Sequence, residues 1–159
     1  MAALTGLLET YNSVRLNQTA HTWEEAVRES VKPLVEAGAV LPEYADMIIE
    51  STHTLGPYYI LCPYVAMPHA QVGSHIKADS FSFVTLDKPV TFPDGREVLI
   101  LICMAATSTT SVPPEALMQL SDVFTNEGSV EQVCACKDSA SLLRLIDQYS
   151  TDQHDTGHR

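Results

Sequence analysis

The chain has 159 residues, which fits a single domain, and its 45% hydrophobic and 18% charged residues are typical of a globular protein. Twenty acidic against nine basic residues give a formal net charge of −11, which argues against binding to nucleic-acid phosphates. No run reaches the ~18 apolar residues of a membrane span, and a secretory signal pattern is missing. We therefore expect a cytoplasmic domain without direct membrane insertion, whose four cysteines stay reduced.

The first half of the sequence predicts helices and one short strand. Thr22 followed by Glu25 forms a capping box, and apolar residues then recur at helical spacing as far as Gly38, a common helix stop. Pro33 inside that stretch removes a backbone hydrogen bond and predicts a kink. In chain order we expect a helix over 4–11, a strand over 14–16, a helix over 22–37 and a further helix from Pro42 to the break at Gly56-Pro57.

The second half predicts strands, a polar loop and then helices. The run 98–104 is the most hydrophobic and is expected to be a central buried strand. Helices before, between and after strands predict an α/β fold, a three-layer α/β/α sandwich with a small mixed β-sheet. Residues 1–150 form one domain in this prediction, and 151–159 form a polar, disordered tail. The other expected strands are 58–61, 65–67, 81–86 and 90–92, with helices from Pro114, from Ser129 as its cap and from Asp138 or Ser139.

The candidate functional residue is His69, in the sequence Met67-Pro68-His69. Pro68 stiffens the backbone directly before the imidazole, and a strand-like run carries His69 to the start of a loop, where functional residues concentrate. Histidine is a nucleophile near neutral pH because its neutral ring is populated there. A Pro-His pair alone is a weak signal, because an arbitrary histidine is most often a surface or core residue whose hydrogen bonds are met.

The residues before His69 strengthen this signal. Residues 56–70 read Gly-Pro-Tyr-Tyr-Ile-Leu-Cys-Pro-Tyr-Val-Ala-Met-Pro-His-Ala. This stretch resembles the phosphorylation-site motif of the mannitol/fructose-type enzyme IIA domains of the bacterial sugar phosphotransferase system. The ascorbate-type branch is the most similar, with a motif of G-P-Y, apolar residues, A-P and then A-x-P-H. Segments 81–90, 98–106 and 118–120 agree in order and spacing, so the resemblance covers about residues 5–150.

The resemblance implies a phosphoryl carrier. His69 would accept a phosphoryl group on Nε2 from the histidine-containing phosphocarrier protein and pass it to a cysteine of an enzyme IIB. The implied partners are thus the phosphocarrier, enzyme IIB and the membrane permease component, and the sugar is ascorbate or a related one. No cofactor and no metal are implied, and self-association into a homo-oligomer is left open.

Three departures from the family pattern leave an alternative open. Gln71-Val72-Gly73 replaces an Arg-Pro-Glu-like stretch, which removes a cationic partner for the phosphoryl group. Val112 stands where relatives carry a second histidine, and the hydroxyls of Thr110 and Ser111 are the expected substitute donors. Tyr64 occupies the place of a small residue. The alternative is a regulatory or degenerate enzyme IIA-like binding module with little or no transfer.

The surroundings of His69 and the remaining histidines complete the prediction. We expect a shallow depression around His69 with an apolar rim that includes Tyr64, Val72 and Val112, which suits a small transient interface. His75 follows in the same loop, where a solvated residue is the simpler interpretation. The tail holds His154 and His158, but a disordered tail lacks the fixed geometry that a metal site needs.

Overall fold

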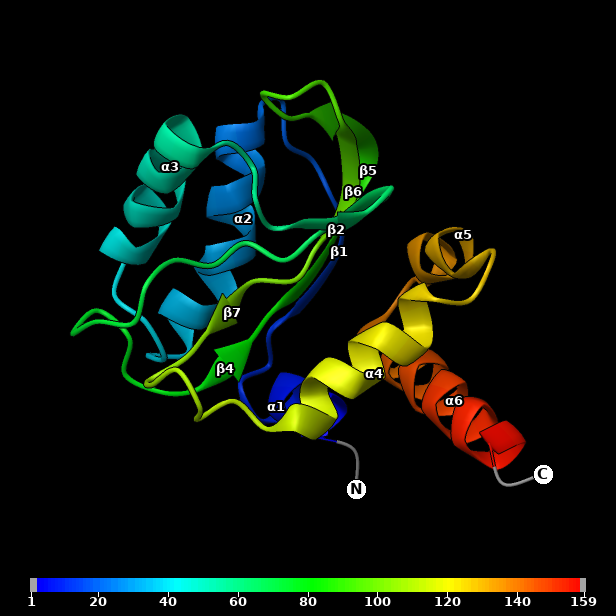
Figure 1. The fold of residues 1–159 in the computed structure, drawn as a ribbon. Helices are drawn as coiled ribbons and strands as arrows, with labels where there is room; N and C mark the ends of the chain where they lie inside the picture. Colours follow the sequence, from blue (N-terminus) through cyan, green and yellow to red (C-terminus); the bar gives the residue numbers. More distant parts are fainter. Residues whose placement is uncertain (1–2, 158–159) are drawn as a thin grey trace.

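The computed structural model describes residues 3–157, which form a mixed five-stranded sheet with helices on both faces (Figure 1). This arrangement confirms the predicted α/β fold. The helices are α1 (Ala3–Thr10), α2 (Trp23–Glu36), α3 (Glu43–Leu55), α4 (Pro114–Phe124), α5 (Ser129–Ala135) and α6 (Ser139–Gly157). The strands are β1 (Val14–Gln18), β2 (Ile60–Cys62), β3 (Tyr64–Ala66), β4 (Ser80–Phe81), β5 (Phe83–Thr91), β6 (Glu97–Leu101) and β7 (Met104–Ala105).

The strand order in the main sheet is β1-β5-β6-β3-β2, so β6 is central as predicted. It pairs antiparallel with β5 and parallel with β3, while β1 lies parallel to β5. The strand ends at Leu101 and not at Met104, although single backbone hydrogen bonds to the β3 side continue from Ile102 and Met104. Met104 instead belongs to β7, which pairs with β4 in a separate two-stranded sheet.

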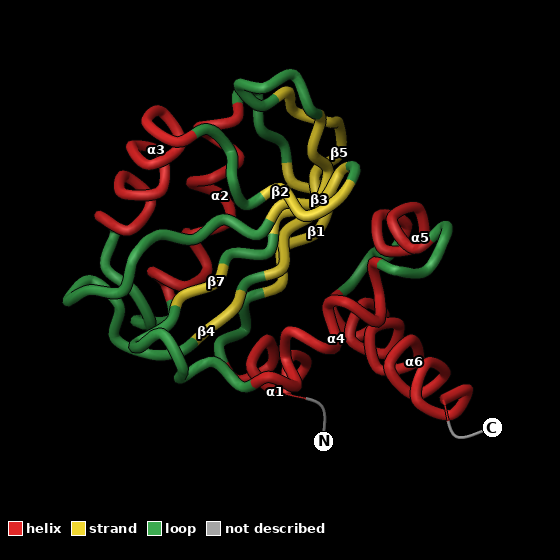
Figure 2. The backbone as a smooth tube through the Cα atoms, in the orientation of Figure 1, coloured by secondary structure: helices red, strands yellow, loops and turns green. Residues whose placement is uncertain are grey.

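The sheet separates two hydrophobic cores, and Figure 2 shows α2 and α3 on one side of it and α1, α4 and α6 on the other. Neighbouring strand residues point to opposite faces, so Val84 packs in the α2–α3 core and Phe83 in the core below the remaining helices. Both side chains are fully buried. The helices predicted from Thr22 and Pro114 thus cover opposite faces, which confirms the three layers.

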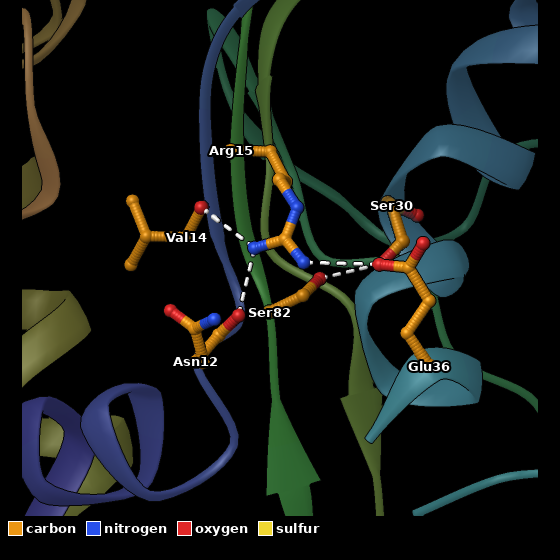
Figure 3. Close-up of polar contacts among 6 residues, drawn as sticks. All are labelled: Asn12, Val14, Arg15, Ser30, Glu36 and Ser82. Carbon is orange, nitrogen blue, oxygen red and sulfur yellow. Dashed lines mark hydrogen bonds and ion pairs between the residues drawn. The ribbon is translucent and has the colours of Figure 1, made fainter. Parts of the chain in front are cut away.

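Helix α2 is tied to the sheet by polar contacts. Thr22 caps it by accepting a hydrogen bond from the amide of Glu25 over 3.2 Å, as the capping box predicts. Arg15 on β1 reaches Glu36 at the other end of the helix, with 3.0 Å between Nη2 and Oε1 (Figure 3). Ser82 Oγ donates to the carbonyl oxygen of Ser30 over 2.5 Å in the same view. These contacts fix α2 on the sheet, and α3 packs against α2.

The carboxyl-terminal helices differ from the prediction in two places. Ser129 is the first residue of α5, and Gly128, with φ of +83°, takes the cap position expected for Ser129. Asp138 does cap α6, accepting from the amide of Ser141 over 2.8 Å. The helix then continues to Gly157 through most of the segment expected to be a tail, where no proline interrupts its backbone hydrogen bonds. Residues 158 and 159 lie outside the described residues.

Candidate phosphoryl-transfer site

His69 stands where the chain leaves the main sheet. Beyond the end of β6, the amide of Ile102 donates to the carbonyl oxygen of Ala66 over 2.9 Å, and that of Met104 donates to the carbonyl oxygen of Pro68 over 3.0 Å. Strand-like pairing therefore continues to Pro68 and stops there. His69 follows directly, half-buried, at the loop start that its sequence predicts.

The hydrogen bonding of His69 determines which ring nitrogen is free. Nδ1 lies 2.8 Å from the carbonyl oxygen of Met67. A carbonyl oxygen can only accept, so Nδ1 carries the hydrogen in this contact. In a neutral imidazole the other nitrogen, Nε2, then holds an unshared lone pair. Within residues 3–157 no hydrogen bond to Nε2 occurs, which leaves this atom available as a nucleophile.

A surface depression surrounds His69 on the side of α3. Its apolar part comes from the end of α3 and the turn behind it, and its polar part from hydroxyl, amide and carboxyl groups. None of the described lining residues is a lysine or arginine, and Glu50 supplies a negative charge. The lining residues besides His69 are Met47, Glu50, Ser51, Thr54, Leu55, Tyr58, Ala70 and Gln71.

The apolar rim differs from the predicted one. Leu55 and Tyr58 line the depression, with 70% and 43% of their surface exposed. Tyr64 lies elsewhere, in a second depression next to the β5–β6 turn. Val112 packs, partly buried, against the core of α1, α4 and α6. Neither residue lines the depression at the end of α3, a separation that sequence spacing does not reveal.

The expected supporting donors belong to another loop. Ser111 Oγ donates to Asp79 Oδ1 over 2.6 Å, and Thr107 donates to the same oxygen through its amide and its hydroxyl. Burial opposes ionisation of Asp79, but these hydrogen bonds prevail and lower its pKa. The amide of Thr110 donates to Ser108 Oγ over 3.3 Å. Among the described residues, no hydrogen bond joins Thr110 or Ser111 to His69, so their supporting role stays a prediction.

His75 folds back onto its own loop. Its ring stacks on Tyr44 with 5.4 Å between centroids, and Nε2 lies 3.3 Å from the carbonyl oxygen of Gln71. Gly73 permits this turn, because a Cβ atom there would lie 2.6 Å from the His75 ring. The loop after His69 is therefore compact, with the partly buried His75 ring between Tyr44 and the Gln71 carbonyl.

Two tyrosines that the sequence did not single out contact the chain at His69. Tyr58 Oη donates to the carbonyl oxygen of His69, and the two rings meet edge to face at 90°. The amide of Ala70 donates to Tyr44 Oη over 3.1 Å. Gly56, with φ of +78°, ends α3 and turns the chain so that Tyr58 faces His69. The signals available were the motif position of Tyr58 and the need of a buried Tyr44 hydroxyl for a partner.

Metal binding finds no support in the described part of the chain. No group of three or more histidine, cysteine or acidic side chains is placed to hold an ion there. His154 and His158 lie where the side chains are not described. Across residues 3–157, no helix combines the length and hydrophobicity that crossing a membrane requires.

Comparison with known proteins gives consistent matches. The model of the family "Phosphoenolpyruvate-dependent sugar phosphotransferase system, EIIA 2" matches residues 8–149. The ascorbate-specific PTS system EIIA component of Mycoplasma pneumoniae is 38% identical over 149 residues, which cover 93% of this chain and 94% of that protein. The crystal structure of a PTS IIA (PtxA) from Streptococcus mutans is similar with a TM-score of 0.88 and 44% identity, covering 93% and 95% of the two chains. A PTS IIA domain from Streptococcus pyogenes reaches 0.87 and 39%, covering 92% and 97%.

Proposed function

We propose a phosphoryl-carrier function at His69 for this chain, which belongs to the EIIA 2 family of the phosphoenolpyruvate-dependent sugar phosphotransferase system. Family membership confirms the resemblance found around His69, and the ascorbate-specific relatives favour ascorbate or a related sugar. The observation that carries the proposal is the free Nε2 of His69. Because Nδ1 donates to the carbonyl oxygen of Met67, the lone pair of the neutral ring lies on Nε2.

In the proposed transfer, His69 releases no proton. Its Nε2 lone pair attacks the phosphorus of a phosphohistidine on the phosphocarrier, the new N–P bond forms, the old one breaks, and its electron pair returns to the donor ring. In the second step a cysteine thiolate of enzyme IIB attacks the same phosphorus, and the breaking bond returns its pair to Nε2. The Met67 carbonyl keeps its hydrogen bond to Nδ1 and stabilises the positive charge that the ring gains.

The depression suits a group that is held only briefly. Ser51, Thr54 and Gln71 can offer neutral hydrogen-bond donors, and Thr110 and Ser111 remain candidates for the same role. Neutral donors stabilise a phosphoryl group less than charged ones do. A carrier benefits from this, because the group must leave again.

The proposed partners are the phosphocarrier and an enzyme IIB attached to its membrane permease, and we place the exchange in the cytoplasm. Leu55 and Tyr58 give the depression an exposed apolar edge, which suits a small interface that forms and separates quickly. The net charge of −11 favours encounter with a basic partner surface.

A regulatory module with little or no transfer is the second candidate. The observation that favours it is the lining of the depression, where the described residues include Glu50 but neither lysine nor arginine. Such a protein would keep the same docking surface and expose His69 without loading it. Transfer assays separate the two functions directly.

The first prediction concerns His69 and is tested by phosphorylation. We expect the full chain, incubated with enzyme I, the phosphocarrier and phosphoenolpyruvate, to gain one phosphoryl group by intact mass, labile in acid and stable in base. His69→Gln should abolish this gain, while the free energy of unfolding changes by less than about 1 kcal/mol because the side chain is only half-buried.

His53→Gln is the matched control. His53 is exposed at the end of α3, contacts Trp23 and does not line the depression, so this variant should be labelled like the wild type. Full labelling of His69→Gln would reject the carrier assignment at this residue. A wild-type chain that stays unlabelled with its own phosphocarrier would favour the regulatory module.

A further inference from the structure

The peptide unit between His69 and Ala70 is held at both of its polar groups by tyrosine hydroxyls. Tyr58 Oη donates to its carbonyl oxygen, and its N–H donates to Tyr44 Oη over 3.1 Å. A peptide unit is planar, so anchoring both groups fixes the orientation of the whole plane. The Cα atom of His69 lies in that plane, and the imidazole is attached there through Cβ.

The sheet supplies no main-chain partner for this peptide. Backbone hydrogen bonds from Ile102 and Met104 follow the chain to Ala66 and Pro68 and then end. A partly buried peptide without partners costs free energy. The two tyrosines therefore take over the hydrogen bonding at the residue that carries the nucleophile.

Both tyrosines are held in place by their own contacts. Tyr44 is fully buried in the first turn of α3, and its hydroxyl also donates to the carbonyl oxygen of Met104 over 2.7 Å. Burial raises the pKa of Tyr44, so the phenol keeps the proton that it donates. Tyr58 follows the other end of α3 and packs edge-on against Tyr59, with 5.0 Å between ring centroids. One helix thus positions both anchors.

Tyr58 also contacts the imidazole itself. The Tyr58 and His69 rings are perpendicular, with 5.4 Å between centroids. Nδ1 of the same imidazole donates to the carbonyl oxygen of Met67. The edge contact and the hydrogen bond together restrict rotation of the His69 ring. The ring is therefore oriented before any partner arrives.

We propose that Tyr58 and Tyr44 are positioning residues that hold His69 Nε2 in line for phosphoryl transfer. This inference rests on the proposed function and adds the residues that align the nucleophile. Transfer needs the attacking and leaving atoms in line, and a displacement of ~1 Å can cost about 100-fold in rate. The two hydroxyls act through the His69–Ala70 peptide.

The test removes one hydroxyl and keeps the ring. For Tyr58→Phe we expect kcat for transfer from the phosphocarrier to fall about tenfold while KM changes less than about twofold, because alignment and not docking is lost. NMR should show one fixed orientation of the His69 side chain in the wild type and averaging between orientations in the variant, with a shifted Ala70 amide. Tyr149→Phe is the control, since its hydroxyl contacts Gln132 far along the chain from His69.

Each outcome decides the proposal. A Tyr58→Phe protein with wild-type kcat, or with the His69 side chain held in the wild-type orientation, overturns the positioning role. Tyr44→Phe tests the other anchor, and if it does not fold, Tyr58→Phe decides alone because that side chain is 43% exposed and not part of the core. A wild-type chain that takes up no phosphoryl group contradicts the proposed function instead, and the comparison of His69 side-chain orientation then decides the positioning role by itself.

Discussion

Two loops of this chain use polar side chains in opposite ways. The loop 67–76 after β3 is held from outside by Tyr44 and Tyr58, and its His69 keeps one nitrogen unpaired. The loop 106–112 after β7 is held by Asp79, which accepts hydrogen bonds from Thr107 and Ser111. In the first loop, tyrosines from other elements bind the His69–Ala70 peptide, while in the second the loop's own hydroxyls are used for its folding.

This difference teaches where a reactive group can remain available. A side chain that must support its own loop has its hydrogen-bonding capacity occupied. Nε2 of His69 is not needed to hold its loop, because the Met67 carbonyl binds Nδ1 and tyrosine hydroxyls bind the neighbouring peptide. Ser111 is not relieved, since its hydroxyl is directed at Asp79 and at the carbonyl oxygen of Ser108. The predictions below test this contrast.

The largest effect on stability is expected for Tyr44→Phe. Losing this buried hydroxyl leaves the Ala70 amide and the Met104 carbonyl without their partner, which costs ~1–3 kcal/mol of unfolding free energy. Urea denaturation monitored by circular dichroism measures it.

Tyr59→Phe provides the comparison for Tyr44→Phe. Tyr59 is equally buried, but its hydroxyl only meets Thr52 Oγ1, at 2.7 Å, and Thr52 can still donate to the carbonyl oxygen of Ile48. We expect a loss of about 1 kcal/mol or less. Equal losses in the two variants would mean that the His69 loop is not specially dependent on Tyr44.

A smaller effect, on the extent of phosphorylation, is expected when the negative charge of Glu50 in the depression is removed. Glu50 shares the depression with His69 and repels a phosphoryl group there. Glu50→Gln should raise the phosphorylated fraction at equilibrium with the phosphocarrier about threefold at low salt, and ~0.5 M salt should remove most of the gain. Intact mass spectrometry gives the fraction.

Glu43→Gln changes the net charge equally and serves as its control. Glu43 is exposed in the first turn of the same helix and does not line the depression. Its phosphorylated fraction should stay at the wild-type level. An equal rise in both variants would show that net charge alone matters, and not its place beside His69.

The smallest effect is expected in the second loop. Hydrogen bonds from Ser111 and Thr107 outweigh the opposing effect of burial and hold the pKa of Asp79 below its ordinary value. Ionised Asp79 therefore stabilises the folded chain above about pH 4, and this contribution is lost as the pH falls through the folded pKa. Asp79→Asn should unfold at slightly lower urea concentration than the wild type at pH 7, with the difference shrinking towards pH ~3.

Transfer by Asp79→Asn at pH 7 should change less than about twofold, because this loop supports itself and not His69. A larger loss of transfer would instead support the predicted role of Thr110 and Ser111.

Much of the fold follows from local patterns. Thr22 with Glu25 predicted the start of α2, Gly56-Pro57 the end of α3, and the run from Val98 a central strand. These features depend on residues close in sequence, where capping, turn formation and apolar periodicity act. The separate β4–β7 pair was missed because its strands have two residues each, too few for any alternation to be visible.

The sequence by itself determined that His69 is the candidate nucleophile, since a motif around one residue is local information. Only the tertiary structure decided which of its nitrogens is free and which side chains hold its peptide. Tyr44 lies 26 positions from Ala70, and Ser111 lies 32 from Asp79, so these pairs depend on how α3 and the loops pack. A hydrogen bond requires the distance between donor and acceptor to be correct within a few tenths of an ångström. No periodicity in a sequence specifies the distance between two elements so finely.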